Sequence, residues 1–404
     1  MKNMKKIAAL GMSAVMVAGM MAGCGSSSDS SSSDSKGSSK SGDKVELTLG
    51  IWDENQRDAM QKMIDAYEAE NDNVSISIQL TPYKGGEYWT KLEASAGGGT
   101  APDVFWLNVL HLDSYVEGGI LDDMTDAIAS SDIKDNFSDT LVNNYVRDGK
   151  NYAVPKDFDT NALWYNKDLF DQAGVEYPTD DMTYDDLVAL ATELKDKLPD
   201  GVYPFACPVD FQTWYYQTVY ANGGWILNDD ATETGYGDAK TQEGIQCWID
   251  MIDAGLSPSA STLSETGSDA MFEGEQIAMT LAGSYMVPEY ASNDTIKDKI
   301  DCVEVPTFNG VEDNCINGLG FAVYEGSKQK EEAEKFAIWM GSSEAQKIQG
   351  ETGVVISARS DAQQYFAKAN EQYNLAAYTN HSDEAYHCRY AAKQQNCMIW
   401  NLPG

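Results

Sequence analysis

Hydrophobic and polar residues alternate in two short runs of the chain, at 45–51 and 74–80. A period of two residues is typical of half-buried β-strands. Between these runs, apolar residues within 60–67 recur every three or four positions and predict an amphipathic helix. Strand, helix and strand in this order form a βαβ unit. We therefore expect a parallel sheet with ligand groups near the carboxyl ends of its strands, where residues 52–55 stand.

The same periods continue toward the middle of the chain. A helix is expected from 88 to 96 because three glycines end it, and the apolar run 102–107 predicts a buried third strand. A mostly polar helical region follows from 110 to about 147. Trp106, Trp164, Trp248 and Trp339 lie inside apolar runs and are expected in the core.

The stretch 151–170 interrupts this pattern and is expected to cross between two lobes. Pro155 has no backbone N–H, so a turn or crossover is favoured over a central strand. Asp157 and Asp159 follow it and are expected to face a cleft, while 165–170 is expected to anchor the second lobe as a strand and a helix start.

Further α/β elements follow the crossover. Thr183 and Asp186 match a capping box, and apolar residues from 187 to 198 share one helical face. An aromatic-rich stretch at 205–225 and a strand at 277–281 come next. The elements after the crossover predict a second α/β domain.

The composition limits the number of domains and the kinds of partner that the protein can have. The chain has 404 residues, of which 42% are hydrophobic, and a formal net charge of -36. The residues after 43 are numerous enough to bury the cores of two domains. The negative charge argues against a nucleic acid or an anionic membrane surface as partner, because both repel an acidic body.

The amino terminus has the features of a secretory signal: lysines precede an apolar stretch that ends near Met20 and is too short for a lasting membrane span. The residues before Cys24 are similar to a bacterial lipobox. We expect residues 1–23 to be a signal peptide and Cys24 to carry lipid, with ordinary cleavage and release as the alternative. Residues 24–43 are mostly Ser, Gly, Asp and Lys and are expected to be a flexible tether.

Several motifs resemble one family in the same order along the chain. VPKDFDTNALWYNKDLF at 154–170, PDVFWL at 102–107 and the stretch 270–285 resemble segments of the bacterial extracellular solute-binding proteins, family 1. These are the sugar-binding components of ABC importers. GVVISAR at 353–359 is similar to a further family segment, with a serine in place of the usual proline. The resemblance covers nearly all of residues 44 to 360.

This resemblance implies an α/β, two-lobed periplasmic-binding-protein-like (type II) fold. Each lobe is expected to be a mostly parallel sheet flanked by helices, with the ligand cleft between the lobes. Crossings are expected near Asp159, Phe308 and Ile356. Lobe 1 is expected to comprise 44–158 and 311–355, and lobe 2 to comprise 159–310 and 356–404.

The resemblance also implies a function. We expect a lipid-anchored protein on the extracellular face of the membrane that delivers a sugar, with an oligosaccharide favoured, to an ABC importer. The implied partners are the carbohydrate ligand and the permease subunits of the transporter. A monomer without a cofactor is expected.

Sugars present an apolar face of C–H groups bordered by hydroxyls, so a site for them needs aromatic plates and paired donors and acceptors. The ligand-binding candidates are aromatic and polar residues near strand ends and turns that match family positions. They are Trp52, Asp53, Asn55, Asn108, Asp157, Asp159, Trp214, Tyr215, Tyr285 and Asn317. No catalytic or metal-binding residue is expected.

Two alternatives stay open. Tyr215 and Tyr216 are adjacent tyrosines of the kind that exported ferric binders use, so a non-sugar solute such as a metal ion or a polyamine is one alternative. Abundant carboxylates leave a secreted glycoside hydrolase as the other. The sequence shows no G-x-S-x-G, Walker or H-E-x-x-H motif, and we do not expect an enzyme.

Six cysteines follow Cys24, and an even number permits disulfides in an exported protein. Free buried thiols are favoured, because the spacing shows no compact framework, and Cys302 and Cys315, which flank a turn region, are the pair to test first for a disulfide. The others are Cys207, Cys247, Cys388 and Cys397. The segment 380–404 lacks the closing helix common in the family, so we expect a truncation or a shifted reading frame near residue 386.

Overall fold

The computed structural model describes residues 44–83, 86–209, 212–228, 232–312, 314–380 and 386–387. The expected signal peptide, Cys24, the tether, Cys388 and Cys397 lie outside the described residues. The segment suspected of a shifted frame also lies outside them, except for 386–387.

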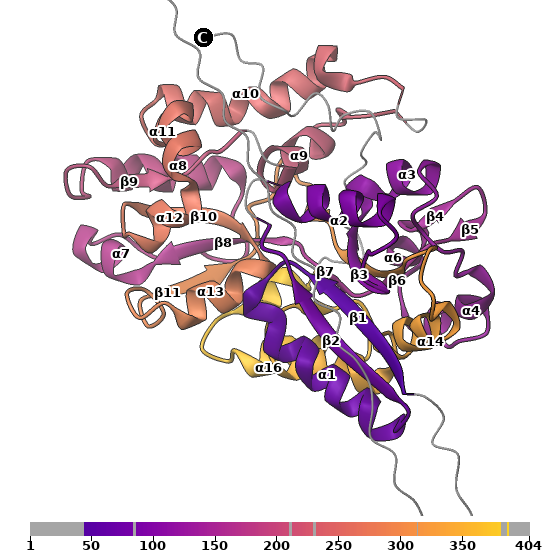
Figure 1. Ribbon diagram of the computed structural model, residues 1–404. Helices are drawn as coiled ribbons and strands as arrows, with labels where there is room; N and C mark the ends of the chain where they lie inside the picture. The colour runs from indigo at the N-terminus through magenta and orange to yellow at the C-terminus, as the bar shows by residue number, and fades with distance from the viewer. Residues whose placement is uncertain are drawn as a thin grey trace, which may run out of the picture. The chain divides into compact units, whose positions relative to one another are not determined.

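The first sheet has five strands, and the predicted βαβ unit forms one side of it. Its order is β2 (Val74–Leu80), β1 (Val45–Ile51), β3 (Val104–Asn108), β13 (Leu319–Val323) and β6 (Val154–Pro155). Helix α1 (Arg57–Glu70) packs against β2, and α14 (Lys330–Met340) packs against β13 and β6 (Figure 1). Pro155 lies in the edge strand, where a missing N–H breaks no ladder.

The second sheet has four strands, all from the middle of the chain. Its order is β11 (Ile300–Val303), β8 (Asn161–Asn166), β10 (Ile277–Gly283) and β9 (Tyr203–Phe205). Helices α8 (Tyr184–Lys195), α9 (Gln212–Ala221) and α12 (Ser268–Glu273) pack against β9 and β10. Figure 1 shows these helices gathered around the second sheet, away from α1 and α14.

The sheets are less parallel than expected. β1 runs parallel to β2 and β3, and β10 runs parallel to β9. In contrast, β13 is antiparallel to β3 and β6, and β8 is antiparallel to β10 and β11. The reason is that β8 and β13 start directly after a crossing between the sheets. Their first residues, Asn161 and Leu319, pair with the last residues of β10 and β3, so the strands run in opposite directions.

Three crossing segments lie side by side between the sheets. β7 (Asp157–Phe158) pairs antiparallel with β14 (Ile356–Ser357), and Asp159 forms an isolated bridge with Asn317. The expected crossing near Phe308 is wrong, because Phe308 instead pairs with Val311 across a tight turn. The second crossing is at Asn317.

The predicted capping box of α8 is confirmed, since the Thr183 hydroxyl accepts from the Asp186 N–H while the Asp186 carboxylate accepts from the Thr183 N–H. The expected helical region from 110 to 147 consists of short helices. The remaining helices are α2 (Glu87–Gly97), α3 (Val109–Glu117), α4 (Thr125–Ala129), α5 (Ile133–Asn136), α6 (Asp139–Asn143), α7 (Lys167–Ala173), α10 (Ala239–Asp253), α11 (Ala260–Thr266), α13 (Val287–Ser292), α15 (Ser343–Glu351) and α16 (Gln363–Ala369).

Short strands and 3-10 turns complete the described elements. The strands are β4 (Val146–Arg147), β5 (Lys150–Asn151), β12 (Cys315–Ile316) and β15 (Tyr386–His387). The 3-10 turns are η1 (Glu54–Gln56), η3 (Gly235–Gly237), η4 (Ser284–Met286) and η5 (Leu375–Tyr378).

The tryptophans expected in the core are largely there. Trp106, Trp164 and Trp248 are buried, and Trp339 is partly buried against the core of the first sheet. Cys302 is a free thiol in the core, so the suggested disulfide with Cys315 is not formed. Cys207 and Cys247 are also free.

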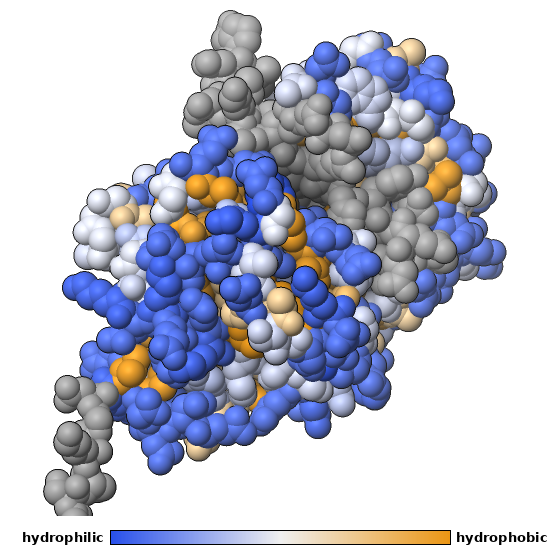
Figure 2. All heavy atoms as spheres, turned by 90° about the vertical axis from the view of Figure 1, so that its right-hand side faces the viewer, coloured by the Kyte–Doolittle hydropathy of each residue, from blue (hydrophilic) through white to orange (hydrophobic). Residues whose placement is uncertain are grey.

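Most residues on the face drawn in Figure 2 are hydrophilic, with apolar residues in small separated patches, as the strong negative charge leads one to expect. Within the described part of the chain, no helix has the length and apolar character needed to cross a membrane.

Candidate functional site

An aromatic group surrounds Trp52, directly after β1. Ring centroids lie close to that of Trp52: Tyr83 at 6.2 Å, Tyr88 at 4.9 Å, Trp89 at 5.4 Å and Trp106 at 5.1 Å. The Tyr88 hydroxyl donates to the Trp106 carbonyl at 3.0 Å, which ties α2 to the end of β3. Trp52 keeps part of its surface exposed, so it offers a flat apolar face held in place by its neighbours.

His111 extends this aromatic group, because its ring stacks on that of Trp89 with centroids 3.7 Å apart. Burial lowers the pKa of His111 to about 4. The neutral imidazole is therefore the form that packs there at neutral pH.

The pKa of His111 provides a direct test of this packing. We expect the imidazole proton resonances of His111 to titrate with a midpoint near 4 in an NMR pH series, since a charged ring loses its hydration in the stack. Comparison with His111→Gln assigns the resonances. A midpoint near the ordinary value of about 6.5 would contradict the buried position.

The turn after β1 is shaped by Asp53. Its carboxylate accepts from the Asn55 N–H and from Gln56 Nε2, both at 2.9 Å, and so caps η1. The exposed Asn55 side chain donates to Glu289 of α13 at 3.1 Å. Because α13 lies between β10 and β11 in the chain, this bond connects the turn after β1 of the first sheet with a helix of the second. Asn108 has a capping role, since its Oδ1 accepts from the Leu110 N–H at 3.0 Å.

A buried ion pair lies at the first crossing. Lys156 is fully buried, and its Nζ contacts Asp157 Oδ2, donates to Gln56 Oε1 at 2.7 Å and lies 4.5 Å from the Trp106 ring centroid. The other Asp157 oxygen accepts from the Leu319 N–H at 2.9 Å. The carboxylate of Asp157 is thus engaged within the protein, and we interpret its role as positioning.

Asp159 differs from Asp157 although it is only two residues away. Its backbone is paired with that of Asn317, with N–O distances of 2.8 and 3.0 Å. Burial, and secondarily the charge of Asp157, raises the pKa of the Asp159 carboxyl to about 7, while Lys156 opposes this shift. A carboxyl that is half neutral at physiological pH is a versatile hydrogen-bond partner.

Two buried polar atoms near Asp159 lack a hydrogen-bond partner among the described residues: Asn317 Oδ1 and Ser284 Oγ. Ser284 lies next to the same crossing, because its N–H donates to the Thr160 carbonyl at 3.2 Å. Leaving such atoms unpaired costs about 1 to 3 kcal/mol each, which a ligand hydroxyl would remove. Asp159, Asn317 and Ser284 together are called the polar group below.

The remaining candidates are more enclosed than expected from sequence. Trp214 and Tyr215 of α9 belong to the buried core of the second sheet and are 4% and 8% exposed. The Tyr215 hydroxyl is 2.7 Å from that of Tyr236. Tyr285, in η4 beside Ser284, is partly exposed. The structure therefore places Asp159, Asn317 and Ser284 at the crossings, with Tyr285 next to Ser284 in the chain. Trp52 lies in the aromatic group after β1, and Tyr215 contacts Tyr236.

Sequence reasoning missed Ser284, Lys156, Tyr83 and Tyr236. Ser284 was within reach, because it stands inside the Gly-Ser-Tyr segment that resembles the family. Nothing in the local pattern indicates that Lys156 is buried, since its partners Gln56 and Trp106 are distant in sequence.

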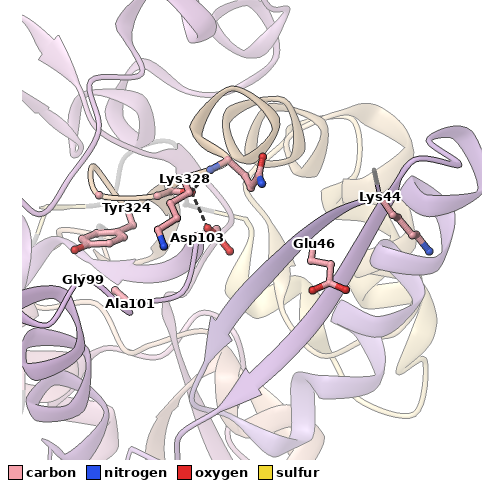
Figure 3. Close-up of a pocket in the computed structure, with 10 residues that line it drawn as sticks. Lys44, Glu46, Gly99, Ala101, Asp103, Tyr324 and Lys328 are labelled. Atoms are coloured by element: carbon pink, nitrogen blue, oxygen red, sulfur yellow. Dashed lines mark hydrogen bonds between the residues drawn. The ribbon is translucent and has the colours of Figure 1, made fainter. Parts of the chain in front are cut away.

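A separate pocket of about 380 Å³ lies at the opposite edge of the first sheet. Figure 3 shows that its lining comes from the start of β1, the turn before β3 and the turn after β13, including Lys44, Asp103 and Lys328. Asp103 is engaged there, because it accepts from the Ser327 hydroxyl at 2.6 Å. None of the candidate residues lines this pocket, so it is distinct from the site at the crossings.

Comparison with known proteins assigns the family. The profile of the bacterial extracellular solute-binding proteins matches residues 53–347, most of the chain. The chain belongs to this family. The members of the family are binding proteins, and both the sequence resemblance and the two-lobed fold class are thereby confirmed.

Individual proteins similar to this solute-binding protein are binding proteins as well. The ABC substrate-binding protein Lmo0181 of Listeria monocytogenes, solved in complex with cycloalternan, is 29% identical with a TM-score of 0.78 over 88% of this chain and 90% of that one. The multiple sugar-binding protein of Streptococcus mutans is 25% identical over 71% of this chain and 68% of its own length. A putative binding protein of Brucella abortus is 26% identical over 72% of this chain and 70% of its own length.

Proposed function

We propose that this solute-binding protein captures a sugar between its two lobes and delivers it to an ABC importer. The observation that carries the proposal is the pair of unpaired buried polar atoms, of Asn317 and Ser284, at the crossings between the sheets. The partly exposed aromatic face of Trp52 after β1 adds the apolar component that a sugar site needs. The match to sugar-binding relatives supports the same ligand class. Aromatic faces suit sugar C–H groups, and unpaired polar atoms suit its hydroxyls.

Capture would proceed by closure of the lobes around the crossings. The bond from Asn55 to Glu289 and the packing of Val109 and Leu110 against the core of the second sheet are contacts that closure would make. A ligand favours the closed form only by binding it better than the open form. Because Trp52 belongs to lobe 1 and Tyr285 to lobe 2 in the proposed division, a sugar contacting both would have that preference.

Anchoring and delivery complete the proposal. Residues 1–23 would be removed, Cys24 would carry lipid including palmitate, and the tether 24–43 would let the monomeric body meet a permease at the outer face of the membrane. Two acyl chains are needed for stable anchoring. We propose the division into lobe 1 (44–158 and 311–355) and lobe 2 (159–310 and 356–404). The strands of the two sheets support it, because those of the first come from 44–158 and 311–355 and those of the second from 159–310; the crossing at Asn317 moves the second boundary to that residue.

A ligand panel tests the function. We expect at least one sugar to raise the melting temperature of the full chain carrying Cys24→Ser, which cannot be lipidated, because ligand binding to the folded form stabilises it. The panel contains glucose, melibiose, raffinose, stachyose, maltose, maltotriose, maltopentaose, cycloalternan and arabinotriose. Ferric iron, spermidine and amino acids serve as comparison ligands. A shift with only iron or spermidine would overturn the sugar proposal, and release of dye from chromogenic glycosides would favour a hydrolase.

The site itself is tested with Trp52→Ala and Tyr285→Ala. Each is expected to weaken binding of the stabilising sugar by about tenfold or more, because each removes an aromatic plate. Calorimetric titration measures the affinity. Tyr365→Ala on α16 is the matched control, since Tyr365 is also partly exposed but contacts Lys347 and Lys368 away from the candidates. Unchanged affinity in both site variants would exclude these residues from the site.

A further inference from the structure

Large exposed hydrophobic side chains are few in the described part of the chain. They are Tyr83 at 53%, Tyr177 at 40% and Tyr236 at 37% exposure. Two of the three, Tyr83 and Tyr236, contact candidate residues of the sugar site, and the third does not.

Tyr83 stands just beyond the carboxyl end of β2, beside the aromatic group. Its ring centroid lies 6.2 Å from that of Trp52 with the planes inclined by 50°. The Gly86 N–H donates to the Tyr83 carbonyl at 2.8 Å. One side of the ring is therefore supported by Trp52, while more than half of its surface remains in water.

Tyr236 has a similar setting on the second lobe. It lies in η3, its hydroxyl is 2.7 Å from that of Tyr215, and its carbonyl accepts from Gln242 Nε2 at 3.2 Å. Tyr215 itself is anchored in the core of the second sheet. The exposed ring of Tyr236 is thus held at its hydroxyl end and at its backbone.

The surroundings of the two tyrosines meet at the start of α3. Val109 packs against the cluster that contains Tyr88 and Trp89, and also against the cluster that contains Tyr215. Val109 therefore contacts the cores of both lobes. Trp52, which contacts Tyr83, packs against the first of these clusters. Tyr215, which contacts Tyr236, belongs to the second.

We propose that Tyr83 and Tyr236 are two outer stacking subsites for the terminal rings of a bound oligosaccharide, one on each lobe. The inference rests on the proposed function and deepens it. A tyrosine ring presents an apolar face to sugar C–H groups and a hydroxyl to their oxygens. Rings already fixed by neighbours lose little conformational freedom on binding, which favours affinity. A monosaccharide held by the polar group would not contact both tyrosines, which belong to different lobes in the proposed division.

Affinity as a function of chain length tests the subsites. The full chain carrying Cys24→Ser is titrated by calorimetry with the melibiose, raffinose and stachyose series, with glucose, maltose, maltotriose and maltopentaose, and with cycloalternan. We expect the tightest ligand to be larger than a monosaccharide. Tyr83→Ala and Tyr236→Ala should each weaken its binding about fivefold to tenfold, and should weaken binding of the smallest sugar that binds by clearly less.

Two further variants separate stacking from other effects. Tyr83→Phe and Tyr236→Phe keep the ring and are expected to retain most of the affinity. Tyr177→Ala is the matched control, because Tyr177 is equally exposed but contacts Tyr165 and donates to Asp171 at 2.7 Å, away from the candidates. All three tyrosines are exposed, so the alanine variants should fold, which the melting temperature checks.

The possible results decide between the two proposals. If a monosaccharide binds as tightly as every longer sugar, or if both alanine variants match Tyr177→Ala, the outer subsites are refuted while sugar binding stands. If no sugar of the panel binds the wild-type chain, the proposed function fails, and the subsites fail with it.

Discussion

Asp159→Asn is expected to make the protein more stable at about pH 8 and, at the same time, a weaker sugar binder. The folded-state pKa of Asp159 is raised to about 7 from an ordinary 3.8, chiefly by burial. The protonated carboxyl therefore stabilises the fold below about pH 4, and this contribution is lost as the pH rises toward 7. A difference of about three pKa units corresponds to at most about 4 kcal/mol. Asparagine is neutral at every pH and avoids the loss.

Urea unfolding at about pH 4, pH 6 and pH 8 measures the effect on Asp159→Asn. The free energies of unfolding of wild type and variant should agree at the lowest pH and diverge as the pH rises. Asp72→Asn is the control for replacing an aspartate by asparagine, since Asp72 lies in an exposed turn. A difference that is the same at each pH would show that Asp159 does not titrate in this range.

The binding half of the prediction follows from the position of Asp159 beside Asn317. An amide offers one acceptor where the carboxyl offers two oxygens, so a ligand hydroxyl loses a partner. We expect about tenfold weaker binding of the stabilising sugar by calorimetry at neutral pH. An affinity equal to that of wild type would remove Asp159 from the site while leaving the stability argument intact.

Lys156→Met is expected to destabilise the protein by about 3 to 5 kcal/mol, because it leaves the buried carboxylate of Asp157 without its cation. Methionine has a similar length and keeps the apolar stem in contact with Trp106. The midpoint of urea unfolding at neutral pH, with the slope checked for constancy, gives the change.

The double variant Lys156→Met/Asp157→Asn tests whether the loss of stability comes from the unpaired charge of Asp157. It should recover much of the lost stability, because an amide oxygen can still accept from the Leu319 N–H. Lys150→Met is the matched control: Lys150 pairs with Asp123 at 2.9 Å, but both side chains are substantially exposed, so little change is expected. Equal effects of Lys156→Met and Lys150→Met would contradict the buried role of Lys156.

Lys156 also connects the turn after β1 with the crossings, and so with the proposed sugar site. Its Nζ reaches Gln56, whose amide in turn donates to Asp53 in the turn after β1. Its backbone N–H donates to the Leu319 carbonyl, and its carbonyl accepts from Gln349. One buried residue thus links the turn that precedes α1 with two other parts of the chain near the hinge.

Local patterns were reliable where the determinant of structure is itself local. The alternation at 45–51 and 74–80 predicted β1 and β2, and Thr183 with Asp186 predicted the start of α8. The position of Trp52 after a strand placed it at the carboxyl edge of the sheet. The ordered motifs predicted the family, which the profile match confirms.

Local patterns failed where position depends on residues far apart in the chain. Phe308 lies near a Pro and an Asn-Gly pair that signal a turn, and the chain does turn there, but the crossing comes later, where Asn317 pairs with Asp159. The local pattern also did not show that Trp214 and Tyr215, whose place in the site stays a prediction, are enclosed by the second core. The pairing direction of β8 and β13 was missed because periodicity carries no information on direction.

The sequence by itself determined the α/β elements, the βαβ start, the family and most of the region in which the ligand is expected. Only the tertiary structure decided which of two neighbouring aspartates has an internal partner, which polar atoms stay unpaired, and which tyrosines keep an exposed face. The physical reason is that elements follow from spacing along one segment. Burial, pKa and hydrogen-bond satisfaction instead follow from side chains such as Lys156, Asn317 and Ser284, which meet only after the chain has folded.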